Sequence, residues 1–298
     1  MAIVFAAMTL ITPRFLTVDN MLGLALEMCI LLIVACGMTF VILTGGIDLS
    51  VSSVFAFSGI LVADVLRRGA PPLVGLVVGL LSGALVGWTN GFLITKGAVP
   101  PFISTLALMT AARGVALVYS KGYPIGIPIE SRFLLLGSAK IFGIPFPIIV
   151  ALVVFLISYV ILSKTHFGRD VYAVGGNLEA ARLSGIRIHT VITWAYVLSG
   201  LFASVGAMIY AARLYTGLPS AGRGAELNAI AAVVLGGTSL SGGEGTIAGT
   251  LLGVLLMATL TNGMVLLGIS ADFQYIVQGA VIVFAIQFDR WRKKYRDV

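Results

Sequence analysis

Charged residues are scarce in this chain. Asp, Glu, Lys and Arg together make up only 10% of its 298 residues, whereas an ordinary soluble domain carries roughly 25%. Hydrophobic residues account for 59%, and the mean hydropathy is +1.07. Water does not keep so apolar a surface dispersed. The composition therefore excludes an ordinary soluble protein and predicts that lipid surrounds most of the chain.

Cysteine is nearly absent as well. Cys29 and Cys36 are the only two, and they lie seven residues apart in an apolar run. On a helix this separation is too large for a disulfide, and the sequence supplies no further ligands for a thiolate metal site. We expect both to be small interior side chains, and we expect no bound metal.

Motifs for enzymatic chemistry are also lacking. The sequence contains no P-loop motif, so it does not bind ATP in the P-loop manner. It contains no HExxH, GxSxG or CxxC pattern either. We therefore expect a chain without catalytic residues and without a cofactor.

The positive charge of the chain is concentrated rather than spread. The net charge is +7, and five of the nineteen basic residues fall within residues 290–296. Such a cluster is typical of a segment that flanks a membrane on the anionic cytoplasmic side. Nucleic-acid binding requires a basic face on a folded domain, so no nucleic-acid partner is expected.

Apolar stretches recur along the chain with short breaks between them. Several are near the roughly 20 residues that cross a bilayer as a helix, and helices are favoured because lipid offers the backbone no hydrogen-bond partners. We predict an all-α, polytopic membrane protein of about ten transmembrane helices, folded as a single permease-like domain over residues 1–298. The ten stretches are Met1–Thr12 (a short first helix), Leu22–Thr44, Val51–Leu66, Leu73–Thr95, Pro101–Tyr119, Pro145–Leu162, Val191–Ala212, Leu227–Leu235, Thr246–Leu267 and Phe273–Phe288.

Orientation follows from the basic residues of the loops and tail. The loop 163–190 and the tail 289–298 are both basic and are separated by four predicted spans, so both can lie in the cytoplasm. Counting back six spans places the N-terminus there too. Seven basic residues depart from this rule and would face outside, namely Arg67, Arg68, Lys121, Arg132, Lys140, Arg213 and Arg223.

Two glycine-rich passages resemble each other. Residues 41–50 read VILTGGIDLS and residues 233–241 read VVLGGTSLS. Paired glycines weaken a helix and let backbones approach closely. The passages predict either two broken helices along a polar path, as in transporters built from related halves, or tight helix packing. Chance similarity among small residues is the alternative to an internal duplication.

Polar residues within the apolar stretches are candidates for the translocation path. Asp48 is the clearest, because a charge at mid-membrane usually faces protein or water. It can equally cap the helix that begins near Leu49 or Ser50. Glu27 and Arg113 raise the same choice between contact with a transported solute and contact with a neighbouring helix. The path candidates are Asp48, Ser50, Asn90, Phe102, Asn228 and Asn262.

The polar loop 163–190 carries the most local detail. Gly175 and Gly176 predict a turn, Asn177 can cap a short helix over Leu178–Ser184, and Gly185 can end it. Leu178, Ala181 and Leu183 offer apolar contacts, while Glu179 and Arg182 are spaced to pair on the surface. The short helix is suited to docking a cytoplasmic partner. The alternative is a helix that lies on the lipid surface.

Four passages together resemble one family. They are GGIDLSV at 45–51, PPFISTLAL at 100–108, FGRDVYAVGGNLEAARLSGI at 167–186 and ELNAIAAVVLGGTSLSGGEGTIAGT at 226–250. In this order they resemble permease subunits of ribose/xylose/arabinose/galactoside-type bacterial ABC importers. The resemblance runs from about Pro13 to the C-terminus. It departs from the family pattern at Asn228, where aspartate is common, and at Ser52, where glycine is frequent.

The resemblance implies a mechanism and a set of partners. It implies a fold similar to vitamin B12-type importers, in the bacterial inner membrane, with a second permease subunit, a cytoplasmic ABC ATPase that is often a tandem-domain protein, and a periplasmic sugar-binding protein. Autoinducer-2 importers share these motifs. An ion-coupled secondary transporter is the rival from another class. The residues that the resemblance assigns to ATPase coupling are Gly168, Arg169, Gly175, Gly176, Asn177, Glu179, Ala181, Arg182 and Gly185.

Overall fold

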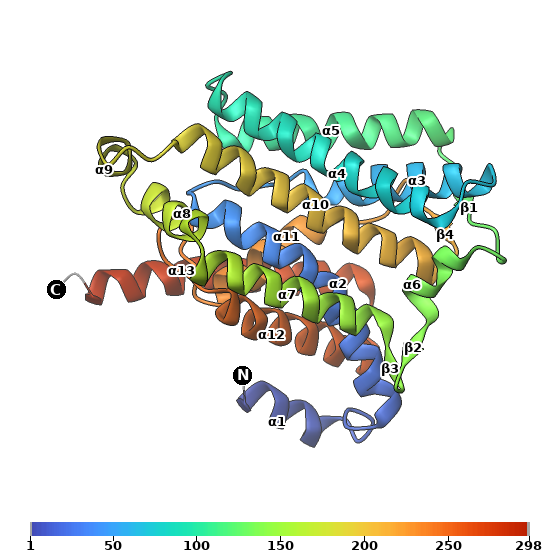
Figure 1. Cartoon of the computed structure of the whole chain (residues 1–298). Coiled ribbons are helices and arrows are strands. Elements are labelled where there is room, and N and C mark those ends of the chain that lie inside the picture. The colour runs from blue at the N-terminus through green and yellow to red at the C-terminus, as the bar shows by residue number, and fades with distance from the viewer. Residues whose placement is uncertain (1, 297–298) are drawn as a thin grey trace.

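The structure is a computed structural model that describes residues 2–296, apart from some side chains in the first and last helices. It is a bundle of helices (Figure 1). In chain order the helices are α1 (Ala2–Ile11), α2 (Val18–Leu43), α3 (Val51–Arg67), α4 (Pro72–Thr95), α5 (Pro101–Ser120), η1 (Arg132–Leu134), α6 (Leu135–Ser138), α7 (Phe146–Lys164), α8 (His166–Gly176), α9 (Leu178–Leu183), α10 (Ile188–Leu214), α11 (Ala225–Leu235), α12 (Ile247–Leu266) and α13 (Ala271–Arg296).

The strands within the described residues are two residues long each. The antiparallel pair β1 (Ile125–Gly126) and β4 (Thr216–Gly217) joins two distant segments, and β2 (Lys140–Ile141) and β3 (Ile144–Pro145) form a small hairpin. Both pairs lie at one end of the molecule, and α9 lies at the other (Figure 1). We call these the strand end and the α9 end.

Each of the ten apolar stretches in the sequence coincides with a helix, so the helical, polytopic prediction is confirmed. Within residues 2–296, six helices are long and apolar enough to cross a membrane, namely α2, α4, α5, α7, α10 and α12. α3, with 17 residues, and α11, with 11, fall short of the roughly 20 residues that a full crossing needs. The basic tail 289–298 continues α13 up to Arg296, and the side chains from residue 288 onward lie outside the described residues.

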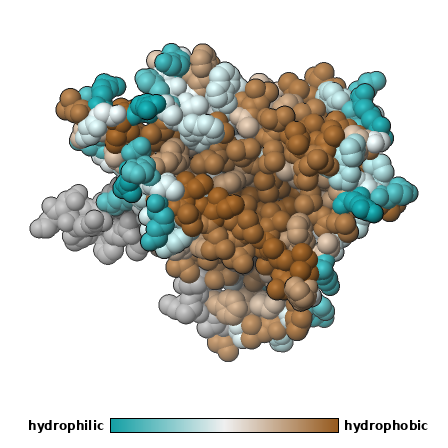
Figure 2. Space-filling model, viewed as in Figure 1, coloured by the Kyte–Doolittle hydropathy of each residue, from teal (hydrophilic) through white to brown (hydrophobic). Residues whose placement is uncertain are grey.

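The interior is built around α2 and α10. Both are mostly buried, whereas α4, α5 and α7 expose most of their apolar side chains. In Figure 2 these exposed side chains form a continuous hydrophobic band, with hydrophilic residues gathered at the α9 end and at the strand end. This pattern is that of a protein whose middle is solvated by lipid and whose two ends face water.

Small residues let α4 and α10 cross with their backbones in contact. A Cβ atom on Gly83 would overlap the carbonyl of Gly200, and one on Gly87 would overlap the carbonyl of Tyr196. Lipid provides no hydrophobic driving force between helices, so such close packing is a main source of attraction between them. Larger residues at these glycines would push the two helices apart.

Both glycine pairs break the chain as predicted. α2 ends at Leu43, Gly45 adopts a φ of +80°, and α3 begins at Val51. α11 ends at Leu235, Gly237 adopts a φ of +90°, and α12 begins only at Ile247. Such φ values favour glycine because it has no Cβ. We call residues 44–50 the first break and residues 236–246 the second break.

One local prediction is wrong. Gly175 and Gly176 do not form a turn, because both belong to α8, which extends to Gly176. The helix continues because the backbone N–H of Asn177 still donates to the carbonyl of Ala173, at 3.1 Å. The segment predicted as a polar loop is therefore mostly helical, with α8 and α9 in succession.

Candidate functional site

Local hydrogen bonds define the two short helices at the α9 end. The Thr165 hydroxyl accepts from the N–H of Gly168 at 3.2 Å and caps α8. The Asn177 side chain accepts from the N–H of Ala180 at 3.0 Å and caps α9, and Gly185, with a φ of +80°, follows the helix end. The predicted short helix, its cap and its terminating glycine are confirmed.

α9 presents an unusual outer face. Leu183 is 87% exposed and Leu178 is 44% exposed, beyond the hydrophobic band of the spans. Glu179 and Arg182 pair at 3.0 Å and both are exposed, which confirms the predicted ion pair. Only Ala181 is buried in this helix. The face is thus small, partly apolar and largely exposed.

Arg169 and Gly168 hold the start of α8. The Arg169 guanidinium lies 2.6 Å from Nδ1 of His166, and both side chains are exposed. A Cβ on Gly168 would overlap the carbonyls of Ile161 and Leu162 at the end of α7. Gly168 therefore permits the sharp turn from α7 into α8.

The C-terminal end of α8 packs directly on both breaks. A Cβ on Gly175 would overlap the carbonyl oxygen of Leu43 and would lie 2.6 Å from the backbone nitrogen of Gly243. One on Gly242 would lie 2.9 Å from both the Gly175 oxygen and the Gly45 nitrogen. The first break, α8 and the second break therefore meet at glycines, without side chains between them. We call this contact the glycine junction, and its residues are Gly45, Gly175, Gly242 and Gly243.

Two hydrogen bonds fasten this junction. The N–H of Gly243 donates to the carbonyl of Leu43 at 3.0 Å, linking the two breaks. The Tyr172 hydroxyl of α8 donates to the carbonyl of Gly245 at 2.7 Å. Burial raises the pKa of Tyr172, so the hydroxyl stays protonated and remains a donor at neutral pH. Sequence reasoning identified the glycine pairs but not that they meet.

Three of the predicted path residues lie together in a buried network. Asp48 Oδ1 accepts from the N–H of Ser50 at 2.9 Å and from its hydroxyl at 2.6 Å, and Asp48 Oδ2 accepts from Ser199 at 2.7 Å. Asn90 donates to the Ser50 hydroxyl at 2.9 Å and accepts from Ser104 at 3.0 Å. All five side chains are essentially inaccessible. The network ties the first break to α4, α5 and α10.

Asp48 does not cap α3 from the N-cap position. The N-cap of α3 is Ser50, and its side chain makes no capping bond. Asp48 instead bonds the backbone two residues on, which is an Asx-type turn before the helix. The capping interpretation therefore holds only in the loose sense that Asp48 orders the entry to α3.

The other predicted path residues lie apart from that network. Phe102 is 55% exposed on α5. Asn262 exchanges two hydrogen bonds with Asn20, at 2.9 and 3.0 Å, and so joins α12 to α2. Asn228 lines a cavity. Arg113 donates to the carbonyls of Ser52, Pro219 and Ala221, which fastens the chain between β4 and α11 to the start of α3.

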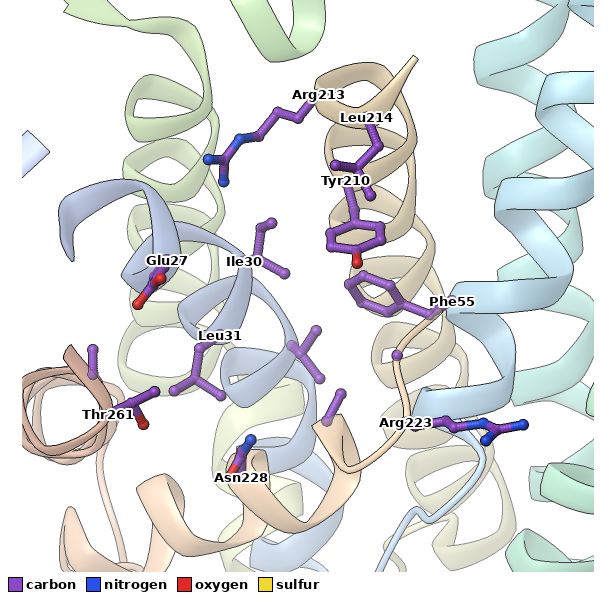
Figure 3. A pocket seen from close by; sticks show the side chains of 14 residues that line it. Glu27, Ile30, Leu31, Phe55, Tyr210, Arg213, Leu214, Arg223, Asn228 and Thr261 are labelled. Atoms are coloured by element: carbon purple, nitrogen blue, oxygen red, sulfur yellow. The ribbon is translucent and has the colours of Figure 1, made fainter. Parts of the chain in front are cut away.

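The cavity beside Asn228 has a volume of about 510 Å³. It lies between the middle of α2, the last turn of α10 and the starts of α3 and α11, with α12 alongside (Figure 3). Since β4 directly follows α10, the cavity belongs to the strand end. Its polar and aromatic lining consists of Glu27, Phe55, Tyr210, Arg213, Arg223, Asn228 and Thr261.

A second buried carboxylate escaped the sequence reading. Asp64 of α3 is only 2% exposed and pairs with Arg67 at 2.8 Å and Arg68 at 2.7 Å. The Tyr119 hydroxyl donates to it at 2.6 Å. The spacing of Asp64 from the two arginines, three and four residues, was the available signal. Among the described residues, no three His, Cys, Asp or Glu side chains are grouped to hold a metal ion.

Comparison with known proteins gives consistent matches over nearly the whole chain. The family model described as "Branched-chain amino acid transport system / permease component" matches residues 20–286. The "Ribose import permease protein RbsC" of Bacillus subtilis (strain 168) is 47% identical over 283 residues, covering 95% of this chain and 88% of that protein. The Escherichia coli (strain K12) protein of the same name is 41% identical over 290 residues, covering 96% and 90%.

A relative named for another sugar matches to a similar degree. The "L-arabinose transport system permease protein AraH" of Escherichia coli (strain K12) is 42% identical over 293 residues, covering 98% of this chain and 89% of that protein. No solved structure matches the chain. The chain belongs to this family of transport-system permease components and is a multi-pass protein of the bacterial inner membrane.

Proposed function

We propose that the chain is the membrane-spanning subunit of an ATP-driven importer of a monosaccharide, ribose or a related pentose or hexose. The ribose and L-arabinose permeases at 41–47% identity support this substrate class. In this proposal a cytoplasmic ABC ATPase hydrolyses ATP, and a periplasmic sugar-binding protein delivers the substrate. A second permease subunit, identical or paralogous, completes the path, and this chain performs no chemistry.

The glycine junction is the observation that carries the coupling part of the proposal. α9 is exposed at one end of the molecule, and at the glycine junction the adjoining α8 contacts both breaks backbone to backbone. A push on α9 therefore reaches the first break and the second break without passing through flexible side chains. Close-packed contacts of this kind transmit displacement because interiors resist compression.

We assign the coupling residues three roles. Glu179 and Arg182, with Leu178 and Leu183, form the surface that meets the ATPase. Asn177, Ala181 and Gly185 set the position of α9 by its cap, its buried contact and its end. Gly168, Arg169 and Gly175 form and seat α8, and Gly176, where an added Cβ would meet nothing within 4 Å, completes its last turn. In this assignment the α9 end faces the cytoplasm, as its basic residues favour.

The full membrane arrangement in this proposal uses ten helices. The four beyond the six long apolar spans are α1, α3, α11 and α13, with α3 and α11 beginning partway across the bilayer after re-entrant segments. Irregular backbone at membrane depth is tolerated where protein or water surrounds it, and Arg113 satisfies the carbonyls of one such segment. A vitamin B12-type architecture is our expectation for the assembled pair of permeases.

The translocation path in this proposal runs beside Asn228. Asp48, Ser50 and Asn90 are fully engaged with one another inside the chain, so they support the wall rather than contact sugar. Asn262 and Asn20 join helices in the same way. Phe102 is exposed on α5, where it is available to lipid or to a second subunit.

The test of coupling uses the exposed face of α9. We expect Leu183→Asp to abolish co-purification of the ATPase and ATP-driven sugar uptake, because it places a charge on the docking surface. The substitution leaves folding intact, since the side chain contacts solvent. Lys164→Asp, an exposed change at the end of α7, is the matched control. The docking role would be refuted if the Leu183→Asp permease assembled with the ATPase and transported sugar normally, and if a permease with the whole of α9 scrambled did so too.

A further inference from the structure

The cavity at the strand end has the size and lining of a small-molecule site. Its volume of about 510 Å³ falls within the roughly 300–1,000 Å³ of ligand pockets. Apolar side chains supply most of the wall, among them Ile30, Leu31 and Val34 of α2. A few polar groups converge between them, as in sites that fix the orientation of a ligand.

The charged groups of the cavity favour a neutral ligand. Figure 3 shows Glu27 on α2 and Arg213 at the end of α10, with the Arg213 guanidinium extending toward α2. The two side chains carry opposite charges and line the same cavity. An anion would meet the Glu27 carboxylate and a cation would meet Arg213. Arg223 points away from the other lining groups in the same view.

Asn228 contributes an acceptor that the fold leaves unused. Its Oδ1 atom is buried and has no hydrogen-bond partner among the described residues. A buried acceptor without a partner costs stability, so natural proteins usually satisfy it with a ligand, water or another side chain. Asn228 lines the cavity near Thr261, with its amide nitrogen toward Leu31 and its oxygen on the far side (Figure 3), so the exposed part of the side chain offers the cavity a donor.

An aromatic pair lies on the remaining side. Phe55 and Tyr210 pack edge to face with centroids 6.0 Å apart at 67°, and both line the cavity. Such rings give a rigid apolar surface, and the tyrosine adds a polar tip. A flat C–H face of a sugar ring packs on a surface of this kind while its hydroxyls reach polar groups at the rim.

We propose that this cavity is a monosaccharide subsite of the permease, which receives a neutral pentose or hexose ring from the strand end. Glu27 accepts from a ring hydroxyl, Arg213 and the Asn228 amide nitrogen donate to a hydroxyl or ring oxygen, and Phe55 with Tyr210 packs against the ring. This inference rests on the proposed importer function. A lipid tail is a poorer occupant, because it would leave Glu27, Arg213 and Asn228 without partners.

Thiol protection tests the subsite directly. A Thr261→Cys permease, assembled with its ATPase in nanodiscs, is treated with a small membrane-impermeant thiol reagent while D-ribose is added. We expect labelling to slow about tenfold once ribose exceeds its Kd about tenfold. Ile129→Cys, on the exposed strand end, reports any general effect of sugar, and glycerol controls for osmolarity. Unchanged labelling of Thr261→Cys at every concentration of ribose and of glucose would overturn the subsite.

A second variant shows whether the lining residues hold the sugar. Adding Glu27→Gln to Thr261→Cys should raise the half-protecting ribose concentration about tenfold, because Gln keeps the acceptor oxygen but loses the charge that strengthens the hydrogen bond. Asp19→Asn, an exposed carboxylate on the same helix, is the matched control and should not shift it. Labelling only by a membrane-permeant reagent would show a lipid-filled cavity and overturn the proposal. Absence of ATP-driven uptake by the unmodified importer would instead refute the proposed function, whatever the protection result.

Discussion

At the scale of single residues, Asp48 shows how a charge is accommodated inside this fold. It is fully buried, and both of its carboxylate oxygens accept hydrogen bonds, from Ser50 and Ser199. Charges at membrane depth are rare and usually paired or hydrogen-bonded. An ion-binding carboxylate of a secondary transporter would need a free oxygen facing a path, and Asp48 has neither a free oxygen nor a place in the lining of the cavity at the strand end.

Asp48→Ala should therefore destabilise the protein, and Asp48→Asn should be tolerated. The alanine variant leaves three donors without an acceptor, and we expect it to lower the free energy of unfolding by about 3 kcal/mol. The asparagine variant keeps the shape, and Ser199 can turn to accept from its amide. Thermal unfolding in detergent measures the difference, with sugar uptake recorded in parallel. Loss of uptake by a stably folded Asp48→Asn would contradict this structural role.

Local sequence signals predicted individual residues well only where their partners are close in the chain. The Asn177 cap, the Glu179–Arg182 pair and the Gly185 terminus involve residues three to eight positions apart, and all are present. One of the two partners of Asp48, by contrast, is Ser199, which lies 151 residues away. No spacing rule connects such positions, so the candidate path residues could be named from the sequence but not placed.

At the scale of elements, two neighbouring glycines of α8 differ in their surroundings. A Cβ on Gly175 would overlap the Leu43 carbonyl, whereas one on Gly176 would meet nothing within 4 Å. We expect Gly175→Ala to displace α8 from both breaks and to lower sugar uptake per ATP at least about tenfold, the scale of a misplacement of functional groups by about 1 Å.

Gly176→Ala is the matched control for that prediction. It adds the same methyl group one residue away, into open space, and should stabilise the helix by up to about 1 kcal/mol. Uptake and ATP hydrolysis of the assembled complex give the coupling ratio for both variants. Equal coupling ratios for Gly175→Ala and Gly176→Ala would contradict transmission through the glycine junction.

Hydrophobic runs predicted the long helices, since a bilayer leaves few alternatives to a helix of about 20 residues. Reasoning from glycine propensity failed at α8, where the glycine pair indicated a turn. Glycine propensity is a weak local preference that tertiary contacts override, and the contacts of Gly175 with Leu43 and Gly243 come from segments far along the chain.

At the scale of the whole molecule, the hydrophobic band between two hydrophilic ends predicts the axis along which the protein crosses the membrane (Figure 2), and the basic loop and tail predict that the α9 end faces the cytoplasm. Single cysteines at Leu183 and Ile129, which are 87% and 80% exposed, mark the α9 end and the strand end. An impermeant thiol reagent should label Leu183→Cys only from the cytoplasmic side and Ile129→Cys only from the outside. The reverse pattern would invert the topology and remove α9 from the reach of an ATPase.

The most direct test of the account is uptake of labelled D-ribose into proteoliposomes that contain this permease, its ATPase and its loaded binding protein. We predict that uptake requires ATP on the α9 side and is unaffected by collapse of proton and sodium gradients. Autoinducer-2 and other sugars, tested in the same vesicles, define the substrate. Uptake that proceeds without the ATPase and follows an ion gradient would contradict the account and identify a secondary transporter.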